Sequence, residues 1–146
     1  MKEIIPMACD HAGYELKVKI KEYLESKGFE VKDFGTNSTD SCDYPDYAHQ
    51  LGSAIEKGEY QRGIVICGSG NGVQMTANKY RHVRCALCWI PEIAHLARQH
   101  NDANVISMPA RFISEDTARE IVAEFISTSF EGGRHERRVE KISQLL

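Results

Sequence analysis

An unbroken apolar run followed at once by a glycine-rich turn constrains the fold of this chain more than any other feature of its sequence. The run is Ile64-Val65-Ile66, and the turn is Gly68-Ser69-Gly70-Asn71-Gly72, which opens a helical pattern. A strand that is apolar at every position is covered on both faces, which is typical of a parallel sheet. The segment from Gly63 to Cys67 is therefore predicted to be a buried strand that leads into a functional loop.

Short β-rich runs alternate with helical patterns along the whole chain, which predicts an α/β protein with a mainly parallel sheet. The last helical pattern begins after Gly132-Gly133 and runs close to Leu146. Because 146 residues suit one domain and no linker interrupts them, we expect a single domain over residues 1–146. The predicted strands cover residues 4–9, 29–34, 63–67, 83–89 and 104–108.

The composition argues against several classes of protein. A formal net charge of −3 gives no reason to expect a nucleic-acid or membrane partner. No apolar run is long enough to span a membrane, and residues 1–6 lack the apolar region of a signal peptide. Five cysteines at irregular spacings are unlike a secreted disulfide framework. We therefore expect a cytoplasmic protein with reduced thiols.

Four segments that could carry chemistry follow predicted strands. They are Asp10-His11, the turn from Cys67 to Gly72, the segment from Pro91 onward and the segment from Pro109 onward. Open α/β sheets bind their ligands beyond the carboxyl ends of the strands. We therefore expect the four segments to converge on one site.

The turn after Cys67 predicts an anion cradle. Backbone N–H groups at the start of a helix, with the helix dipole behind them, can hold a phosphate or the oxyanion of a reaction intermediate. The dipole also favours the thiolate of Cys67, which suits it to act as a base on carbon. The alternative is a plain glycine-rich turn beside a buried cysteine. The dinucleotide fingerprint G-x-G-x-x-G fails at Val73, and no Walker A lysine follows.

Two histidine-containing segments are candidates for binding or proton transfer. His11 can hydrogen-bond a phosphate or a sugar hydroxyl, and Asp10 can fix a hydroxyl. The alternative is an Asp helix cap beside an incidental His. His100, followed by Asn101, is suited to shuttle a proton between a ring oxygen and a hydroxyl, although both are also ordinary loop residues.

The C-terminal segment carries the local positive charge. On a helix, Arg134 and Arg138 share a face that continues into the apolar Ile142 and Leu145. We therefore expect this face to lean against the protein and the two arginines to clamp a phosphate, with Arg137 in solvent. The alternative is a solvated basic helix.

Two further features have simpler interpretations. Cys85 and Cys88 lie three apart in a predicted strand, so they point to opposite faces and are expected to pack in the core rather than share a metal. Tyr44 is either a loop aromatic or a wall against the sugar, and the sequence leaves both open.

Together these segments resemble the family of type B ribose-5-phosphate isomerases, which also contains the galactose-6-phosphate isomerase subunits. The resemblance implies a Rossmann-like three-layer α/β/α sandwich with about five parallel strands. It also implies a homodimer or homotetramer with active sites at the subunit interface. The matching stretches keep their order over nearly the whole chain and are residues 10–13, 43–48, 67–72, 77–79, 98–104 and 132–135 with Arg138.

The resemblance also implies roles for individual residues. Cys67 matches the base that moves the proton between C1 and C2. Members without this cysteine use a glutamate a few residues later; here Cys67 is present and the residues after it include Val73 and Gln74, so the resemblance indicates the cysteine type. Ser69 supplies a hydroxyl that is often threonine, and His100, assisted by Asp10, opens the sugar ring. The residues expected to bind substrate or its phosphate are His11, Tyr44, Gly68, Gly70, Asn71, Gly72, Asn101, Arg111, Arg134 and Arg138.

The resulting hypothesis is an aldose–ketose isomerase without cofactor or metal. It would interconvert ribose 5-phosphate and ribulose 5-phosphate through an enediol(ate), in the non-oxidative pentose phosphate pathway. The backbone N–H groups from Gly68 to Gly72 would hold the enediolate oxygen. Two alternatives remain open at this point: a hexose-6-phosphate isomerase acting on allose or galactose 6-phosphate, and a non-catalytic sugar-phosphate sensor.

Overall fold

The computed structural model describes residues 1–144 and contains five parallel strands in one sheet. The strand order is β2-β1-β3-β5-β4, and every neighbouring pair is parallel. This order confirms the predicted α/β class and places β3 at the centre, between β1 and β5. The strands are β1 (Ile4–Cys9), β2 (Glu30–Asp33), β3 (Gly63–Cys67), β4 (Cys85–Leu87) and β5 (Val105–Pro109).

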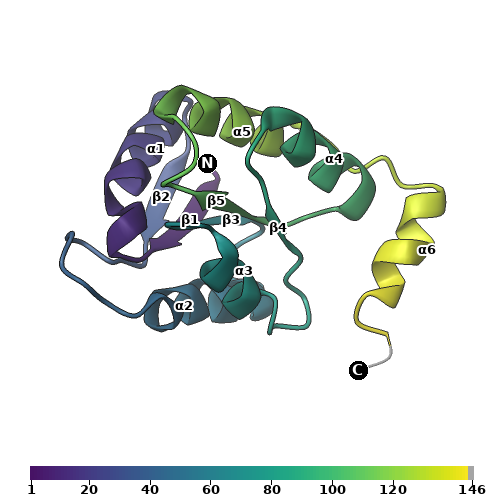
Figure 1. Ribbon diagram of the computed structural model, residues 1–146. Helices are drawn as coiled ribbons and strands as arrows, with labels where there is room; N and C mark the ends of the chain where they lie inside the picture. Colours follow the sequence, from purple (N-terminus) through teal and green to yellow (C-terminus); the bar gives the residue numbers. More distant parts are fainter. Residues whose placement is uncertain (145–146) are drawn as a thin grey trace.

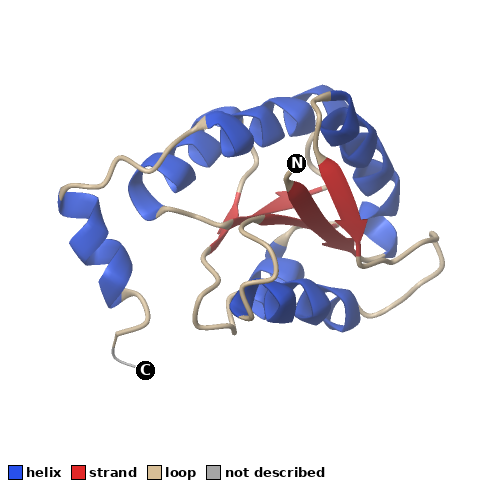
Figure 2. Cartoon of the chain, turned by 180° about the vertical axis from the view of Figure 1, so that it is seen from behind, coloured by secondary structure: helices blue, strands red, loops and turns tan. Residues whose placement is uncertain are grey.

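Helices cover both faces of the sheet, which gives three layers (Figures 1 and 2). One face packs against α1, α4 and α5, and the other against α2 and α3, with a separate apolar cluster on each side. No helix within residues 1–144 has both the length and the apolar character needed to cross a membrane. The helices are η1 (His11–Gly13), α1 (Tyr14–Ser26), α2 (Tyr44–Glu56), α3 (Asn71–Ala77), α4 (Pro91–Asn101), α5 (Glu115–Ser127) and α6 (Arg134–Lys141).

The central strand behaves as its apolar run predicts. All five residues of β3 are buried, and Ile64, Val65 and Ile66 have no exposed surface. Their side chains alternate between the two apolar clusters, so β3 joins both halves of the core.

Two elements are shorter than predicted by at least two residues at one end. The strand expected over residues 83–89 spans only Cys85–Leu87. Before Cys85, the backbone N–H of Arg84 donates to a side chain, Asn104 Oδ1, at 2.7 Å, and not to a backbone carbonyl of the neighbouring strand. The last helix ends at Lys141 rather than near Leu146, and residues 142–144 form a turn. Leu145 and Leu146 lie outside the described residues.

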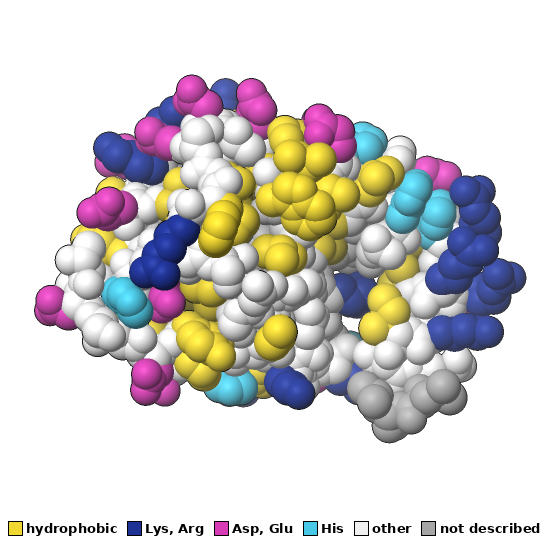
Figure 3. All heavy atoms as spheres, in the orientation of Figure 1, with side chains coloured by type: hydrophobic (Ala, Val, Ile, Leu, Met, Phe, Trp, Pro, Cys, Tyr) yellow, Lys and Arg dark blue, Asp and Glu magenta, His cyan; other side chains and the backbone are white. Residues whose placement is uncertain are grey.

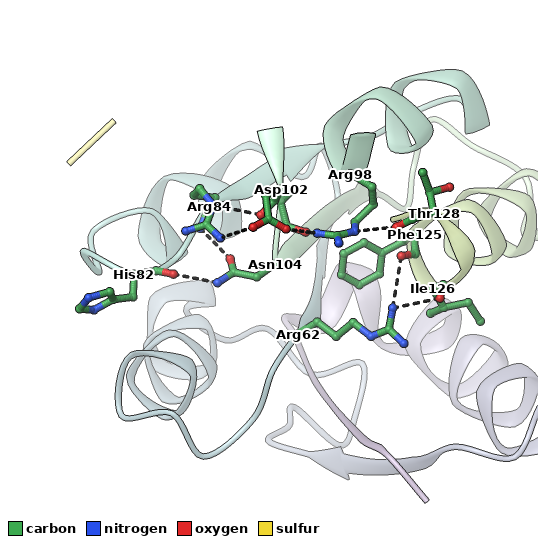
Figure 4. A network of polar contacts seen from close by, with 10 residues as sticks. Arg62, His82, Arg84, Arg98, Asp102, Asn104, Phe125, Ile126 and Thr128 are labelled. Atoms are coloured by element: carbon green, nitrogen blue, oxygen red, sulfur yellow. Dashed lines mark hydrogen bonds and ion pairs between the residues drawn. The ribbon is translucent and has the colours of Figure 1, made fainter. Parts of the chain in front are cut away.

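An arginine network closes the amino edge of the sheet (Figure 4). Arg98 donates to Asp102 Oδ1 at 2.9 Å and to the carbonyl of Thr128 at 3.1 Å. Arg62 donates to the carbonyl of Ile126 at 3.0 Å and pairs with Glu3. The network holds the last turns of α4 and α5 against the starts of the strands, and leaves the carboxyl edge free for a ligand.

Candidate active site

The carboxyl ends of β1, β3 and β5 lie side by side because these strands are neighbours in the sheet. The loops that follow them enclose an open cavity of about 610 Å³. Nine of the residues singled out in the sequence line it directly. The lining consists of Asp10, His11, Ala12, Tyr44, Cys67, Gly68, Ser69, Asn71, Gly72, Met75, Arg111 and Phe112.

The turn between β3 and α3 is fixed from behind by β5. The Ser107 hydroxyl donates a 2.6 Å hydrogen bond to the carbonyl of Gly70, and both groups are buried. Gly70 has a φ of 77°, and a Cβ there would stand 2.5 Å from Leu87 Cδ1. Only glycine therefore suits this position. Gly70 shapes the turn but is not part of the cavity lining.

Backbone donors of this turn are free for a ligand. No backbone hydrogen bond within residues 1–144 uses the N–H groups of Gly68, Ser69 or Gly70. The hydroxyl oxygen of Ser69 accepts the N–H of Asn71 at 3.3 Å, which holds the turn open toward the cavity. Cys67, 5% exposed, lies directly before these donors. A thiolate beside unpaired N–H groups can take a proton from a carbon whose neighbouring oxygen those groups stabilise.

Asp10 both caps a helix and lines the cavity, so the two alternatives for it are not exclusive. Its Oδ1 accepts the N–H groups of Ala12 and Gly13 at 3.0 and 3.1 Å. These bonds fix the carboxylate of Asp10, a residue that is only 7% exposed, just beyond the carboxyl end of β1.

His11 faces the same cavity in a defined tautomer. Its Nδ1 accepts the N–H of Cys42 at 3.3 Å. The neutral ring therefore carries its proton on Nε2, where it can donate to an anion.

Tyr44 and Arg111 complete the walls. The Tyr44 ring packs on the backbone of Gly72, where an added Cβ would stand 2.5 Å from Tyr44 Cε1, so the structure places Tyr44 as a wall. Arg111 follows β5, and its backbone N–H donates to the carbonyl of Gly68 at 3.0 Å. The sequence analysis did not predict Phe112 or Met75 as lining residues. The only signals were that Phe112 follows Arg111 and that Met75 lies one helical turn after Asn71.

Four predicted site residues lie elsewhere in the chain. His100 and Asn101 end α4, and Arg134 and Arg138 belong to α6, which packs against α4 and stands away from the sheet (Figure 1). None of the four lines the cavity. They form a second group where α6 meets α4, and the Lys and Arg side chains of α6 form a basic edge at the right of the molecule (Figure 3).

The prediction that Arg134 and Arg138 lean against the protein is wrong. Both are exposed, as is Ile142 at 55%, and the buried residue of α6 is His135. Gly132 and Gly133, with φ of 73° and 57°, turn the chain so that a different helix face meets α4. The other predicted member of the apolar face, Leu145, lies outside the described residues.

His135 stacks on His100 where α6 meets α4. The ring centroids are 4.2 Å apart and the planes lie within 12° of parallel. Burial, with smaller contributions from His100 and Arg134, lowers the pKa of His135 below its usual value. Its imidazole is therefore neutral near pH 7.

Three of the other four cysteines are packing residues. Cys9, Cys85 and Cys88 are buried, as predicted for the last two. Burial raises the pKa of the Cys9 thiol to about 11 and that of Cys88 to about 12, and it raises the pKa of Cys85 well above the usual value. These thiols stay protonated at neutral pH and are poor nucleophiles.

Comparison with known proteins gives one consistent result. Residues 5–142 match the family model described as ribose/galactose isomerase. The chain is 43% identical to ribose-5-phosphate isomerase B of Escherichia coli over 141 residues, which cover 97% of this chain and 95% of the relative.

Solved structures agree in fold. A ribose 5-phosphate isomerase from Thermotoga maritima superposes with a TM-score of 0.95 at 49% identity, covering 99% of each chain. Ribose-5-phosphate isomerase B from Mycoplasma genitalium, solved with bound ribulose-5-phosphate, gives a TM-score of 0.95 at 43% identity and covers 99% of this chain and 97% of that one.

Proposed function

The chain belongs to the ribose/galactose isomerase family, and we propose that it interconverts ribose 5-phosphate and ribulose 5-phosphate. The observation that carries this proposal is the cavity in which Cys67 lies beside three unpaired backbone N–H groups. The similarity to a structure that holds ribulose-5-phosphate supports the substrate. We further propose that it acts in the non-oxidative pentose phosphate pathway and in the cytoplasm.

Cys67 is the proposed base. Its thiolate removes the C2 proton of the open-chain aldose and returns it to C1, so the C1 aldehyde becomes a hydroxymethyl group and C2 becomes the ketone. The negative charge of the enediolate intermediate falls on oxygens that the N–H groups of the Gly68–Gly72 turn can hold. Ser69, whose hydroxyl lies in the same turn, moves a proton between the two oxygens.

The substrate phosphate is proposed to bind between residues that line the Cys67 cavity and the arginines of α6. His11 offers its Nε2–H, and Arg111 lies across the same cavity. Arg134 and Arg138, four apart on exposed α6, have the spacing of a bidentate clamp.

The two groups of residues meet only if a second copy of the chain supplies one of them. α6 stands off from the body: a cavity of about 430 Å³ lies between it and residues 81–84, and one of about 500 Å³ lies between residues 78–86 and the turn that follows α6 (Figure 3). At the mouth of the Cys67 cavity Phe112 is 76% exposed and Met75 64%, which indicates a surface that a partner covers. We therefore infer a symmetric dimer, alone or within a tetramer, in which α6 and the end of α4 of one subunit reach the cavity of the other.

In that arrangement His100 and Asp10 open the sugar ring together. His100 transfers a proton between the ring oxygen and the C1 hydroxyl, and Asp10, fixed by its two N–H donors, orients that hydroxyl. Asn101 follows His100 and supplies an amide for the sugar hydroxyls.

Isomerisation in deuterated water tests the proposal. The wild type and Cys67→Ala are incubated with ribose 5-phosphate, and ribulose 5-phosphate and the label at C1 are followed by NMR. We expect turnover with label in the wild type, a collapse in Cys67→Ala, and normal turnover in the control Cys88→Ala, whose thiol is buried in the core and does not line the cavity. Turnover that survives in Cys67→Ala would refute the base assignment. Absence of turnover on the pentose, with turnover of galactose or allose 6-phosphate, would identify a hexose-phosphate isomerase, and turnover of none would indicate a sensor.

A further inference from the structure

Three metal-ligating side chains meet where α6 joins α4. His100 lies in the last turn of α4, Glu131 in the connection and His135 in the first turn of α6. One ligand atom from each lies within 4.8 Å of the other two. His135 Nε2 and Glu131 Oε1 are 3.7 Å apart, too far for a hydrogen bond.

The buried imidazole of His135 lacks a partner. Its side chain is only 8% exposed, and its Nε2 has no hydrogen-bond partner within residues 1–144. Buried polar atoms are nearly always paired, so an orphan nitrogen that points toward a carboxylate indicates a ligand between them.

We propose that His100, Glu131 and His135 form a binding site for a divalent transition-metal ion of the Zn²⁺ or Ni²⁺ class. Two imidazoles and one carboxylate are ligands that such ions prefer, and three protein ligands leave a position open for water or an anion. Bond lengths of about 2.0–2.2 Å bring the ligand atoms of a tetrahedral ion roughly 3.4 Å apart. The observed separations need to shrink only modestly.

The stacked rings define what must move. An imidazole donates its lone pair in the plane of its ring, and the planes of His100 and His135 are nearly parallel, so the two lone pairs do not converge. His100 is half-buried at the end of its helix, and a rotation of its ring can bring a nitrogen to the ion. His135 and Glu131 already face one another. The ion is therefore expected to fix His100 in an orientation that it does not adopt without metal.

The charged neighbours set the conditions of the test. Arg134 and Arg138 lie close enough to His135 to disfavour a further cation, whereas the Glu131 carboxylate favours one. The ion is therefore expected to bind with modest affinity, and phosphate must be left out of the buffer because the arginines can hold it.

Calorimetric titration of the full chain with Ni²⁺ tests the site. We expect one ion per chain in the wild type and an affinity that falls on the order of 10–100-fold or more in His135→Ala and in Glu131→Gln. Glu131→Gln keeps the size of a side chain that is 46% exposed, so it should fold normally. His82→Ala is the matched control, because it removes another His–Glu pair, 2.6 Å apart, without a third ligand, and should leave binding unchanged.

Two outcomes would overturn the site. The first is unchanged affinity in both His135→Ala and Glu131→Gln. The second is binding that is lost in Cys67→Ser instead, which would place the ion at the thiol of the other cavity. A rise in melting temperature with Ni²⁺, absent in Glu131→Gln, gives a second readout that does not depend on catalysis.

The consequence for activity rests on the proposed function. If His100 opens the sugar ring, bound Ni²⁺ withdraws it and inhibits isomerisation, and a chelator restores the rate. Glu131→Gln should isomerise at the wild-type rate but resist the ion. A chain that binds Ni²⁺ as expected but turns over no sugar phosphate would refute the isomerase and leave the metal site standing; inhibition that is equal in Glu131→Gln would refute the metal's action through this site.

Discussion

The hydroxyl of Ser107 in β5 donates a 2.6 Å hydrogen bond to the carbonyl of Gly70 in the turn after β3. Both residues are buried, so the bond is shielded from water. The bond anchors the turn to a strand that lies far from it in the sequence. It thereby fixes the direction of the N–H groups proposed to bind the enediolate. The quality of the cradle therefore depends on a strand that carries no proposed catalytic residue.

Ser107→Ala should lower both stability and turnover. The Gly70 carbonyl would keep the N–H of Gln74 at 3.2 Å but lose the buried bond from Ser107, which costs about 1 kcal/mol in free energy of unfolding. We expect kcat to fall while KM changes little, because the loosened donors act on the intermediate. Urea unfolding and initial rates check this. Ser26→Ala, which removes an exposed 2.6 Å bond to the Tyr23 carbonyl, should change neither; equal effects of the two variants would contradict the assignment.

Lys17→Met should be strongly destabilising. Lys17 is 1% exposed and donates to Asp33 Oδ1 and to the carbonyl of Thr36. Removing one partner of such a pair leaves a poorly solvated charge and costs about 3–5 kcal/mol. Urea unfolding should show this loss, and Asp33→Asn added to Lys17→Met should recover part of it. Arg119→Ala, which breaks exposed pairs with Glu115 and Asp116, should cost under about 1 kcal/mol.

Stability should fall at alkaline pH because of the buried thiols. Burial raises the pKa of Cys9 to about 11 and that of Cys88 to about 12, whereas thiols in unfolded chains ionise near pH 8.5. Above that pH the unfolded chain releases protons that the folded chain retains, so the free energy of unfolding decreases by about 1.4 kcal/mol per pH unit for each thiol. The contribution is complete below pH 8.5 and is lost as the pH rises toward 11 or 12.

Urea unfolding at pH 8, 9 and 10 measures this loss. Lysines and tyrosines also titrate in the range, so the slope of the wild type is compared with that of Cys88→Ala, which should be shallower. Cys42→Ala, which removes a partly exposed thiol, should keep the wild-type slope. Identical slopes in all three proteins would show that Cys88 ionises equally easily in both states.

Periodicity sufficed to predict the sheet, the helices and the loops at its carboxyl edge, because burial of apolar faces determines these elements. The position of α6 could not be predicted in this way. Its packing face depends on the positive φ angles of Gly132 and Gly133, and the sequence shows only that two glycines stand there. The ion pair of Lys17 could not be predicted either, because its partner Asp33 belongs to β2, which comes close to Lys17 only in the folded chain.

The part of the candidate site that lies within one chain could be predicted from the sequence. Asp10, Cys67 and Arg111 converge because β1, β3 and β5 are neighbours. His100 and the α6 arginines have chemistry that fits the same substrate, but no spacing along the chain tells whether one subunit or two bring them together.

Mixing two inactive variants should restore activity if each active site is shared between subunits. Cys67→Ala damages the cavity side and His100→Asn the α4 side, so each homodimer has no intact site. After unfolding and refolding together, half of the dimers are hybrids, and each hybrid has one intact site, which predicts roughly a quarter of wild-type activity. Isomerisation rates of the refolded mixture measure this. The matched control mixes Cys67→Ala with Asp10→Asn, which lie on the same side of the site and cannot complement one another. No recovery in the first mixture, with hybrids present by native mass spectrometry, would show that His100 serves the cavity of its own chain.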